Sequence, residues 1–214
     1  MPKVENLRKY DRKPYHFGFL LGANTMDFVI KSYKNFNNYD SLYVLESSPK
    51  FGFNIGIIAD LTLGKYFNLR FLPTLSFGER TLNYKIKNSI QVFYDVTKRV
   101  ESTYLDFPLI FKFKSARLNN FRAYVTTGAK YSFDLASLAK KNENPDEIVI
   151  KLKPHDLSFE LGVGFDFYTI YFKFGTQIQM SYGIMNLLKR ENNVFTNSIE
   201  RLNSKIFQLS FTFE

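Results

Sequence analysis

Cysteine and tryptophan are absent from this sequence of 214 residues, and histidine occurs only twice. Without cysteine the chain can form no disulfide bond, no thiol nucleophile and no cysteine-ligated metal site. Long apolar runs are missing too, because no segment approaches the ~18 consecutive apolar residues that a membrane-spanning helix needs. At this length a single domain is expected, since all-β barrels of this size routinely stay undivided.

Aromatic residues are abundant instead: 24 Phe and 14 Tyr make up 18% of the chain. Such a composition favours β-strands. The formal net charge is +9, but no compact run of Lys and Arg indicates a nucleic-acid site. A solvated basic surface, or contact with acidic lipid headgroups, explains the charge. The mean hydropathy of −0.22 resembles that of soluble proteins, and transmembrane barrels share this property because only alternate residues face lipid.

The dominant pattern is an alternation of apolar residues with polar or small ones. In the segment 51–61 the odd positions are apolar, whereas the even positions include Gly52, Asn54 and Asp60. Since a strand directs alternate side chains to opposite faces, this segment has one apolar face and one small or polar face. Eight segments show the alternation, at residues 17–24, 51–61, 69–77, 105–113, 121–131, 157–167, 170–180 and 207–213.

The connections between these segments alternate in length. Short connections span residues 62–67, 115–120 and 168–169, and long ones span 25–50, 79–102, 135–154 and 182–205. This plan is typical of outer-membrane barrels, which have short periplasmic turns and long extracellular loops. We therefore expect an all-β fold: a closed, eight-stranded antiparallel transmembrane barrel over residues 15–214 in the bacterial outer membrane. Residues 1–14 form an N-terminal periplasmic extension without an apolar signal segment, so we expect the export signal to have been removed.

Alternation alone does not decide whether the apolar rows point inward, as in soluble lipocalin-like barrels, or outward toward lipid. The interior of an eight-stranded barrel is only just filled by side chains, and rows rich in Phe and Leu are too bulky for it. Most segments also reach the ~9–11 residues that cross a bilayer. We therefore expect the apolar rows to face lipid and the small residues to face inward, including Gly22, Gly52, Gly56, Gly162 and Gly164.

The polar rows carry ten charged residues, matched five to five. The acids are Asp60, Asp106, Asp134, Glu160 and Asp166, and the bases are Arg70, Lys112, Arg122, Lys130 and Lys173. Buried charges persist only when they are paired, so the balance predicts a network of ion pairs inside the lumen. On a soluble barrel the same residues would be ordinary solvated charges. A lumen filled in this way predicts no open pore, and a function located in the loops, the rim or the partners.

Candidate catalytic residues are scarce. Membrane-barrel enzymes that modify lipids use His with Ser and a carboxylate, but Ser158 lies three positions after His155 and should face the opposite side of a strand. His16 is expected at the other end of the barrel, which excludes a metal site built on both histidines. We expect no catalytic site, cofactor, metal or small-molecule substrate. Pro73 and Pro108 fall inside expected strands and indicate bulges or local kinks.

Three stretches carry a family resemblance: FGFNIGIIADLTLGKYFNLRFLPTLSFGERTLNYKI (51–86), ESTYLDFPLIFKFKS (101–115) and NNFRAYVTTGAKYSFDLAS (119–137). They resemble the PorT family of Bacteroidetes outer-membrane barrels. The resemblance implies a role in the type IX secretion system, which exports proteins with a C-terminal sorting domain and supports gliding motility in some relatives. It also implies other secretion-system proteins as partners. The alternatives are a stand-alone barrel for adhesion or envelope integrity and, less favoured, a lipid-modifying barrel enzyme.

Overall fold

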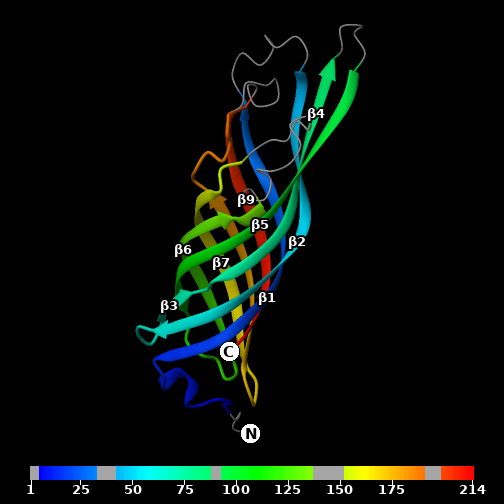
Figure 1. The fold of residues 1–214 in the computed structure, drawn as a ribbon. Helices are drawn as coiled ribbons and strands as arrows, with labels where there is room; N and C mark the ends of the chain where they lie inside the picture. The colour runs from blue at the N-terminus through cyan, green and yellow to red at the C-terminus, as the bar shows by residue number, and fades with distance from the viewer. Residues whose placement is uncertain (1–4, 33–41, 88–92, 137–151, 191–198) are drawn as a thin grey trace.

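The fold is one antiparallel sheet that closes on itself. The computed structural model describes residues 5–32, 42–87, 93–136, 152–190 and 199–214. Within these residues, β1 pairs with β2 on one side and with β9 on the other, which completes the ring (Figure 1). The elements are η1 (Tyr10–Arg12), β1 (Tyr15–Ser32), β2 (Leu42–Thr62), β3 (Phe67–Phe71), β4 (Thr74–Lys87), β5 (Phe93–Lys114), β6 (Phe121–Asp134), β7 (His155–Tyr168), β8 (Lys173–Gly183) and β9 (Ile199–Phe213). The predicted closed antiparallel barrel is confirmed.

Two of these strands share one position in the ring. Both β3 and β4 pair with β2 on one side and with β5 on the other. They are separated only by Leu72 and Pro73, and the register continues across the gap without an extra residue, from Phe71 paired with Leu109 to Thr74 paired with Asp106. Proline has no N–H to donate to a ladder, which explains the interruption at Pro73. The ring therefore has the eight positions that the sequence predicts.

Of the bulge or local kink expected at Pro108, the bulge is wrong. Pro108 lies inside β5 and pairs in register with Lys130 of β6, so no bulge forms there. Its carbonyl oxygen accepts a hydrogen bond from Leu72 N at 3.2 Å. The two prolines thus lie on neighbouring strands at the same level, and the single break in the β3–β4 position accommodates both.

The outer surface of the ring is apolar and the inner surface is polar, as β7 shows most regularly. Its residues alternate strictly between exposed and buried from His155 to Tyr168. The exposed positions are apolar, such as Leu161 and Phe165, whereas Glu160 and Asp166 point inward and are buried. The same outward rows continue around the barrel with Phe17, Phe19, Phe53, Ile57, Phe111, Phe113, Ile178, Phe207 and Leu209. Among the described residues, no helix is long and apolar enough to cross a membrane.

Several strands extend well beyond the ring at the end opposite the two termini (Figure 1). The connections expected at 25–50 and 79–102 are largely strand, because β1 continues to Ser32, β2 begins at Leu42, β4 continues to Lys87 and β5 begins at Phe93. Expecting whole loops there was wrong. Conversely, β8 begins only at Lys173, and the segment from Ile170 to Phe172, expected to be strand, lies in the preceding turn.

In these extensions the polarity of the two faces is reversed. Along β4, Leu82 and Tyr84 are buried inside, whereas Lys85 is exposed. Inward residues of β1, β4, β5 and β9 pack with residues that precede β7 and follow β8. We call this group the apolar cap: Phe28, Leu82, Tyr84, Val100, Leu152, Leu187, Leu188, Ile199 and Leu202. It closes the lumen at the end with the long connections.

The tight packing of the inward glycines makes a first prediction. A Cβ atom on Gly164 would lie 2.5 Å from the carbonyl oxygen of Thr176 and 2.5 Å from the ring of Tyr124, whereas one on Gly64 would meet nothing within 4 Å. Overpacking of this kind costs roughly 1–3 kcal/mol. We expect Gly164→Ala to lower the urea midpoint, measured by heat-modifiable migration on gels, and Gly64→Ala to leave it unchanged. Equal midpoints for the two variants would contradict the inward packing of Gly164.

Candidate functional site

The first group of lumen charges lies toward the end with the short turns and is centred on Arg70 of β3. Its guanidinium group donates to the carboxylates of Asp60 on β2 and of Glu214, and all three side chains are at most 1% exposed. Lys173, at the start of β8, forms a second ion pair with Glu214 at 2.7 Å. These contacts connect β2, β3, β8 and the end of β9. Because β1 and β2 lie between β9 and β3 in the ring, the pair of Arg70 and Glu214 links strands that are not neighbours.

Lys112 and Asp166 form the second pair of this group. They lie on β5 and β7, and Lys112 Nζ is 2.7 Å and 2.9 Å from the two carboxylate oxygens. Both side chains are fully buried. The ammonium group also lies 3.6 Å from the ring centre of Tyr124, which points inward from β6. The charge of Lys112 is therefore compensated by a carboxylate and by an aromatic face.

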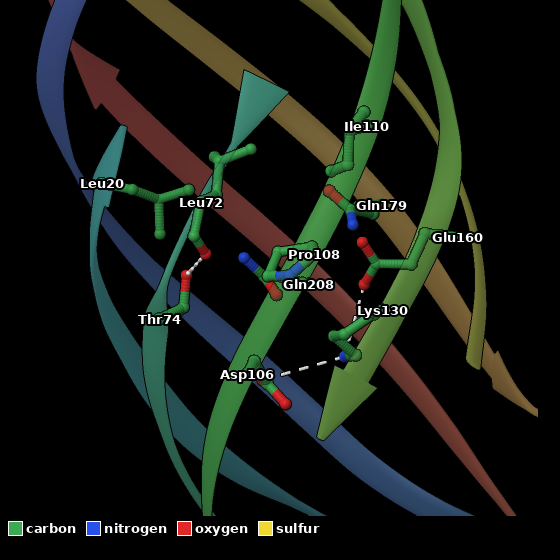
Figure 2. Close-up of a pocket in the computed structure, with 10 residues that line it drawn as sticks. All are labelled: Leu20, Leu72, Thr74, Asp106, Pro108, Ile110, Lys130, Glu160, Gln179 and Gln208. Atoms are coloured by element: carbon green, nitrogen blue, oxygen red, sulfur yellow. Dashed lines mark hydrogen bonds and ion pairs between the residues drawn. The ribbon is translucent and has the colours of Figure 1, made fainter. Parts of the chain in front are cut away.

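A second group of charges lies farther along the lumen, around Lys130 of β6 (Figure 2). Lys130 Nζ lies 3.3 Å from Glu160 and 3.8 Å from Asp106. Serine hydroxyls complete the group, because Ser76 donates to Asp106 and Ser181 donates to Glu160. The adjoining cavity measures about 20 Å³, which is room for about one water molecule. Its volume is far too small for a solute pathway.

Arg80 on β4 was missed by the sequence reading because it lies beyond the predicted end of its strand. It is fully buried and donates to the hydroxyl of Tyr104 at 2.9 Å and to that of Ser204 at 2.8 Å. Its guanidinium carbon also lies 4.6 Å from the ring centre of Phe28, a member of the apolar cap. Arg80 therefore lies where the polar lumen meets the apolar cap. The period-two rule carried forward from Arg70 would have placed Arg80 inside.

All ten charged residues predicted for the lumen are buried inside the barrel. Asp134, at the end of β6, accepts a hydrogen bond from Ala136 N at 3.0 Å, and Arg122 lies at the mouth with the short turns. The inward rows also contain charges that the prediction left out: Arg80, Lys114, Asp156 and Glu214. With these, the described lumen holds seven buried basic and seven buried acidic side chains, so its balance of charge extends beyond the original ten.

The mouth at this end is closed by the segment that precedes β1. Asp11 of η1 accepts hydrogen bonds from both terminal nitrogens of Arg122, at 3.0 Å and 3.4 Å, and from the hydroxyl of Tyr168 at 3.1 Å. Arg117, in the β5–β6 turn, lies 3.5 Å from the same carboxylate. Burial opposes ionisation of Asp11, but Arg122 and Tyr168 outweigh it, and together they hold its pKa below the ordinary value.

Tyr10 enters the mouth beside Asp11. Its ring stacks on His16 with 3.9 Å between ring centres, and its hydroxyl donates to Glu214 at 3.1 Å. Burial and the negative charge of Glu214 raise the pKa of Tyr10, so the phenol keeps the proton that it donates. We call residues 8–13, which include Tyr10 and Asp11, the mouth plug. No pattern in the sequence indicates the plug, because it lies outside every alternating segment.

The two histidines lie in separate parts of the structure. His155 is exposed on the outer surface, and its Nδ1 lies 2.6 Å from the hydroxyl of Tyr131. Ser158 points inward and donates to Asp156 at 3.3 Å, so these groups lie on opposite faces of β7. His16 is bound through Nε2 to the carbonyl oxygen of Tyr10 at 2.8 Å. No group of acidic or histidine side chains suited to a metal ion occurs among the residues described.

Comparison with known proteins supports the same picture. The family described as "Outer membrane protein beta-barrel domain" matches residues 6–189. None of the curated proteins compared with the chain matches it. Similar solved structures include Ail, the attachment invasion locus protein of Yersinia pestis (12% identity, 94% of this chain and 99% of that one, TM-score 0.40). Neisserial surface protein A is also similar, with 8% identity over 94% of this chain and 99% of that one and a TM-score of 0.45. OprG from Pseudomonas aeruginosa has 12% identity over 93% of this chain and 91% of that one and a TM-score of 0.38.

Arg117, Arg122 and Tyr168 together hold the Asp11 carboxylate, and this arrangement, which we call the clamp, makes a second prediction. Its pKa lies below the ordinary value, so the clamp is complete at neutral pH and weakens only as pH falls through that lowered pKa. Asp11→Asn should therefore loosen the plug at neutral pH and speed tryptic cleavage after the exposed Lys9 and Arg12. Glu5→Gln, at an exposed acid of the same segment, is the control. Equal cleavage rates for the two variants would show that the clamp does not hold the plug.

The pair of Lys112 and Asp166 makes a third prediction. Removing one partner of a buried pair strands the other charge and typically costs about 3–5 kcal/mol, whereas replacing both by apolar groups is often near neutral. We expect Lys112→Met to lower the urea midpoint in lipid vesicles strongly, and Lys112→Met with Asp166→Leu to recover much of the loss. A double variant that loses the sum of the two single effects would exclude coupling between these residues.

Proposed function

This chain belongs to the family of outer membrane protein β-barrel domains, and from that premise we propose that it is a non-conducting, non-enzymatic barrel of the bacterial outer membrane that binds partner proteins at its ends. The filled lumen is the observation that carries the proposal. Ion pairs occupy its middle, the apolar cap closes the extracellular end and the mouth plug closes the periplasmic end. A barrel without a passage must act through its surfaces.

The finer proposal is that these partners belong to the type IX secretion system. It is supported by the resemblance of residues 51–86, 101–115 and 119–137 to the PorT family. Part of the lumen network lies in these stretches, including Asp60, Arg70 and Lys112, whereas Glu160, Asp166 and Lys173 lie on β7 and β8, outside them. A closed barrel suits an accessory role, in which it holds or orients other components and does not itself transport cargo.

Conductance tests the closed barrel directly. We expect the purified chain in a planar bilayer to show no stable conductance steps, because ion pairs occupy the middle of the described lumen. An open porin in the same bilayer is the positive control. Steps that persist and scale with salt concentration would refute the closed lumen, and with it the proposal that the barrel acts only through its surfaces.

Deletion of the gene tests the secretion role. Cargo proteins with C-terminal sorting domains should accumulate in the periplasm of the deletion strain, and the wild-type chain should restore their export. Unchanged export would remove the type IX proposal and leave the family assignment intact.

Adhesion is the second candidate, and the strand extensions that surround the apolar cap favour it. The apolar cap gives the strand extensions a core of their own, because Leu82 and Leu202 are completely buried there. A module with a packed core can present a fixed binding surface above the membrane. This candidate predicts normal export in the deletion strain together with reduced attachment of the cells, which is the opposite of the secretion result.

A further inference from the structure

The periplasmic mouth contains more basic than acidic side chains. Lys114, Arg117 and Arg122 surround it, and Asp11 is the acid that they share. Arg117 and Arg122 both reach the Asp11 carboxylate, at 3.5 Å and 3.0 Å. Deeper in the lumen, by contrast, Arg70, Lys112 and Lys173 are matched by Asp60, Asp166 and Glu214. The excess positive charge is therefore local to the mouth.

Two of the donors at the mouth are unused. Lys114, the last residue of β5, is 5% exposed. Its backbone N–H donates to Tyr66 O at 2.7 Å, whereas its ammonium group is influenced by Asp11 and Asp60 only through space and makes no hydrogen bond or close ion pair with a described residue. The two terminal nitrogens of Arg122 donate hydrogen bonds to Asp11, but its Nε is buried without a hydrogen-bond partner. The buried Nε of Arg122 has no acceptor among the described residues, which is unfavourable, so the mouth has a place for a further anionic group.

We propose that this mouth binds carboxylate side chains of an extended acidic segment from a periplasmic protein, with Lys114 and Nε of Arg122 as the receiving donors. Asp11 is an example of a carboxylate bound at this mouth, because it already accepts two hydrogen bonds from Arg122. Exposed basic residues continue outward from the mouth along the plug, at Arg8, Lys9, Arg12 and Lys13. A positive surface of this length suits several carboxylates in a row better than a single small ion.

This inference rests on the proposed function only in taking a protein as the source of the carboxylates. The site itself can be tested on the purified full-length chain in detergent, by calorimetry with three probes: hexaglutamate, hexaglutamine and inorganic phosphate. We expect hexaglutamate to bind, to weaken with rising salt and to surpass both other probes. Binding of phosphate without hexaglutamate would overturn the proposal, because the site would then serve a small free anion. Absence of binding by all three probes would overturn it as well.

Variants then locate the binding. Lys114→Gln should weaken hexaglutamate binding about tenfold or more, since it removes a charged hydrogen-bond donor from the carboxylates of the peptide. Lys65→Gln is the matched control, because Lys65 lies exposed in the neighbouring β2–β3 turn, over the ring of Tyr66, and should leave the affinity unchanged. Equal affinities of the two variants would refute a site at Lys114.

Asp11→Asn provides a second measurement that leaves the barrel wall untouched. Removing the resident carboxylate frees Arg117 and Arg122, so hexaglutamate should bind several-fold more tightly. Unchanged binding to this variant would place the peptide away from Arg117 and Arg122. The result is separable from the secretion assay: a chain that binds hexaglutamate at Lys114 but is dispensable for export would retain this site and lose the type IX role.

Discussion

Closure of the sheet is the constraint on which the rest of the structure depends. A ring of eight strand positions in lipid has no free edge, but its narrow interior must be filled by its own side chains. Placing ions there is unfavourable unless each finds a partner, which is why Arg70 lies between Asp60 and Glu214 and why Lys112 lies on Asp166. Arg70 and Asp60 lie on neighbouring strands, whereas Arg70 with Glu214 and Lys112 with Asp166 join strands that are not neighbours, so these two pairs help to fix the cross-section of the ring and fill its described interior.

The reversal of polarity along β4 follows from the same constraint. Within the membrane the outer face of a strand meets lipid, so Leu75 and Phe77 point outward while Ser76 is buried inside. Beyond the membrane the outer face meets water, and Leu82 and Tyr84 turn the apolar side inward. One strand therefore serves two solvents without breaking its period of two. The interior changes accordingly, from paired charges to an apolar core, with Arg80 at the boundary.

Sequence reasoning reached the ring and much of its lumen because a period of two translates directly into an inner and an outer face. It identified Lys130 and Glu160 as interior charges for that reason. The prediction failed where the strands leave the membrane. Because apolar residues were assigned to the outer face, the apolar inward residues Leu82 and Tyr84 were placed in a loop, and Arg80 was placed there with them. The plug at Tyr10 and Asp11 was out of reach, since its contacts join residues more than 100 positions apart and no local pattern announces them.

The numbers of basic and acidic side chains are equal in the described lumen as a whole, but they are not equal at each level along its axis. The periplasmic mouth has the surplus of bases described for Lys114, Arg117 and Arg122, whereas the extracellular half holds Asp106, Asp134, Asp156 and Glu160 against Lys130 and Arg80. Unpaired charge is least unfavourable where water can reach it, and a mouth meets that condition better than the middle of the lumen does. The same position makes such a charge accessible to another protein. A barrel sealed through its centre can therefore still offer a specific electrostatic surface to the periplasm, and its own Asp11 is already bound there.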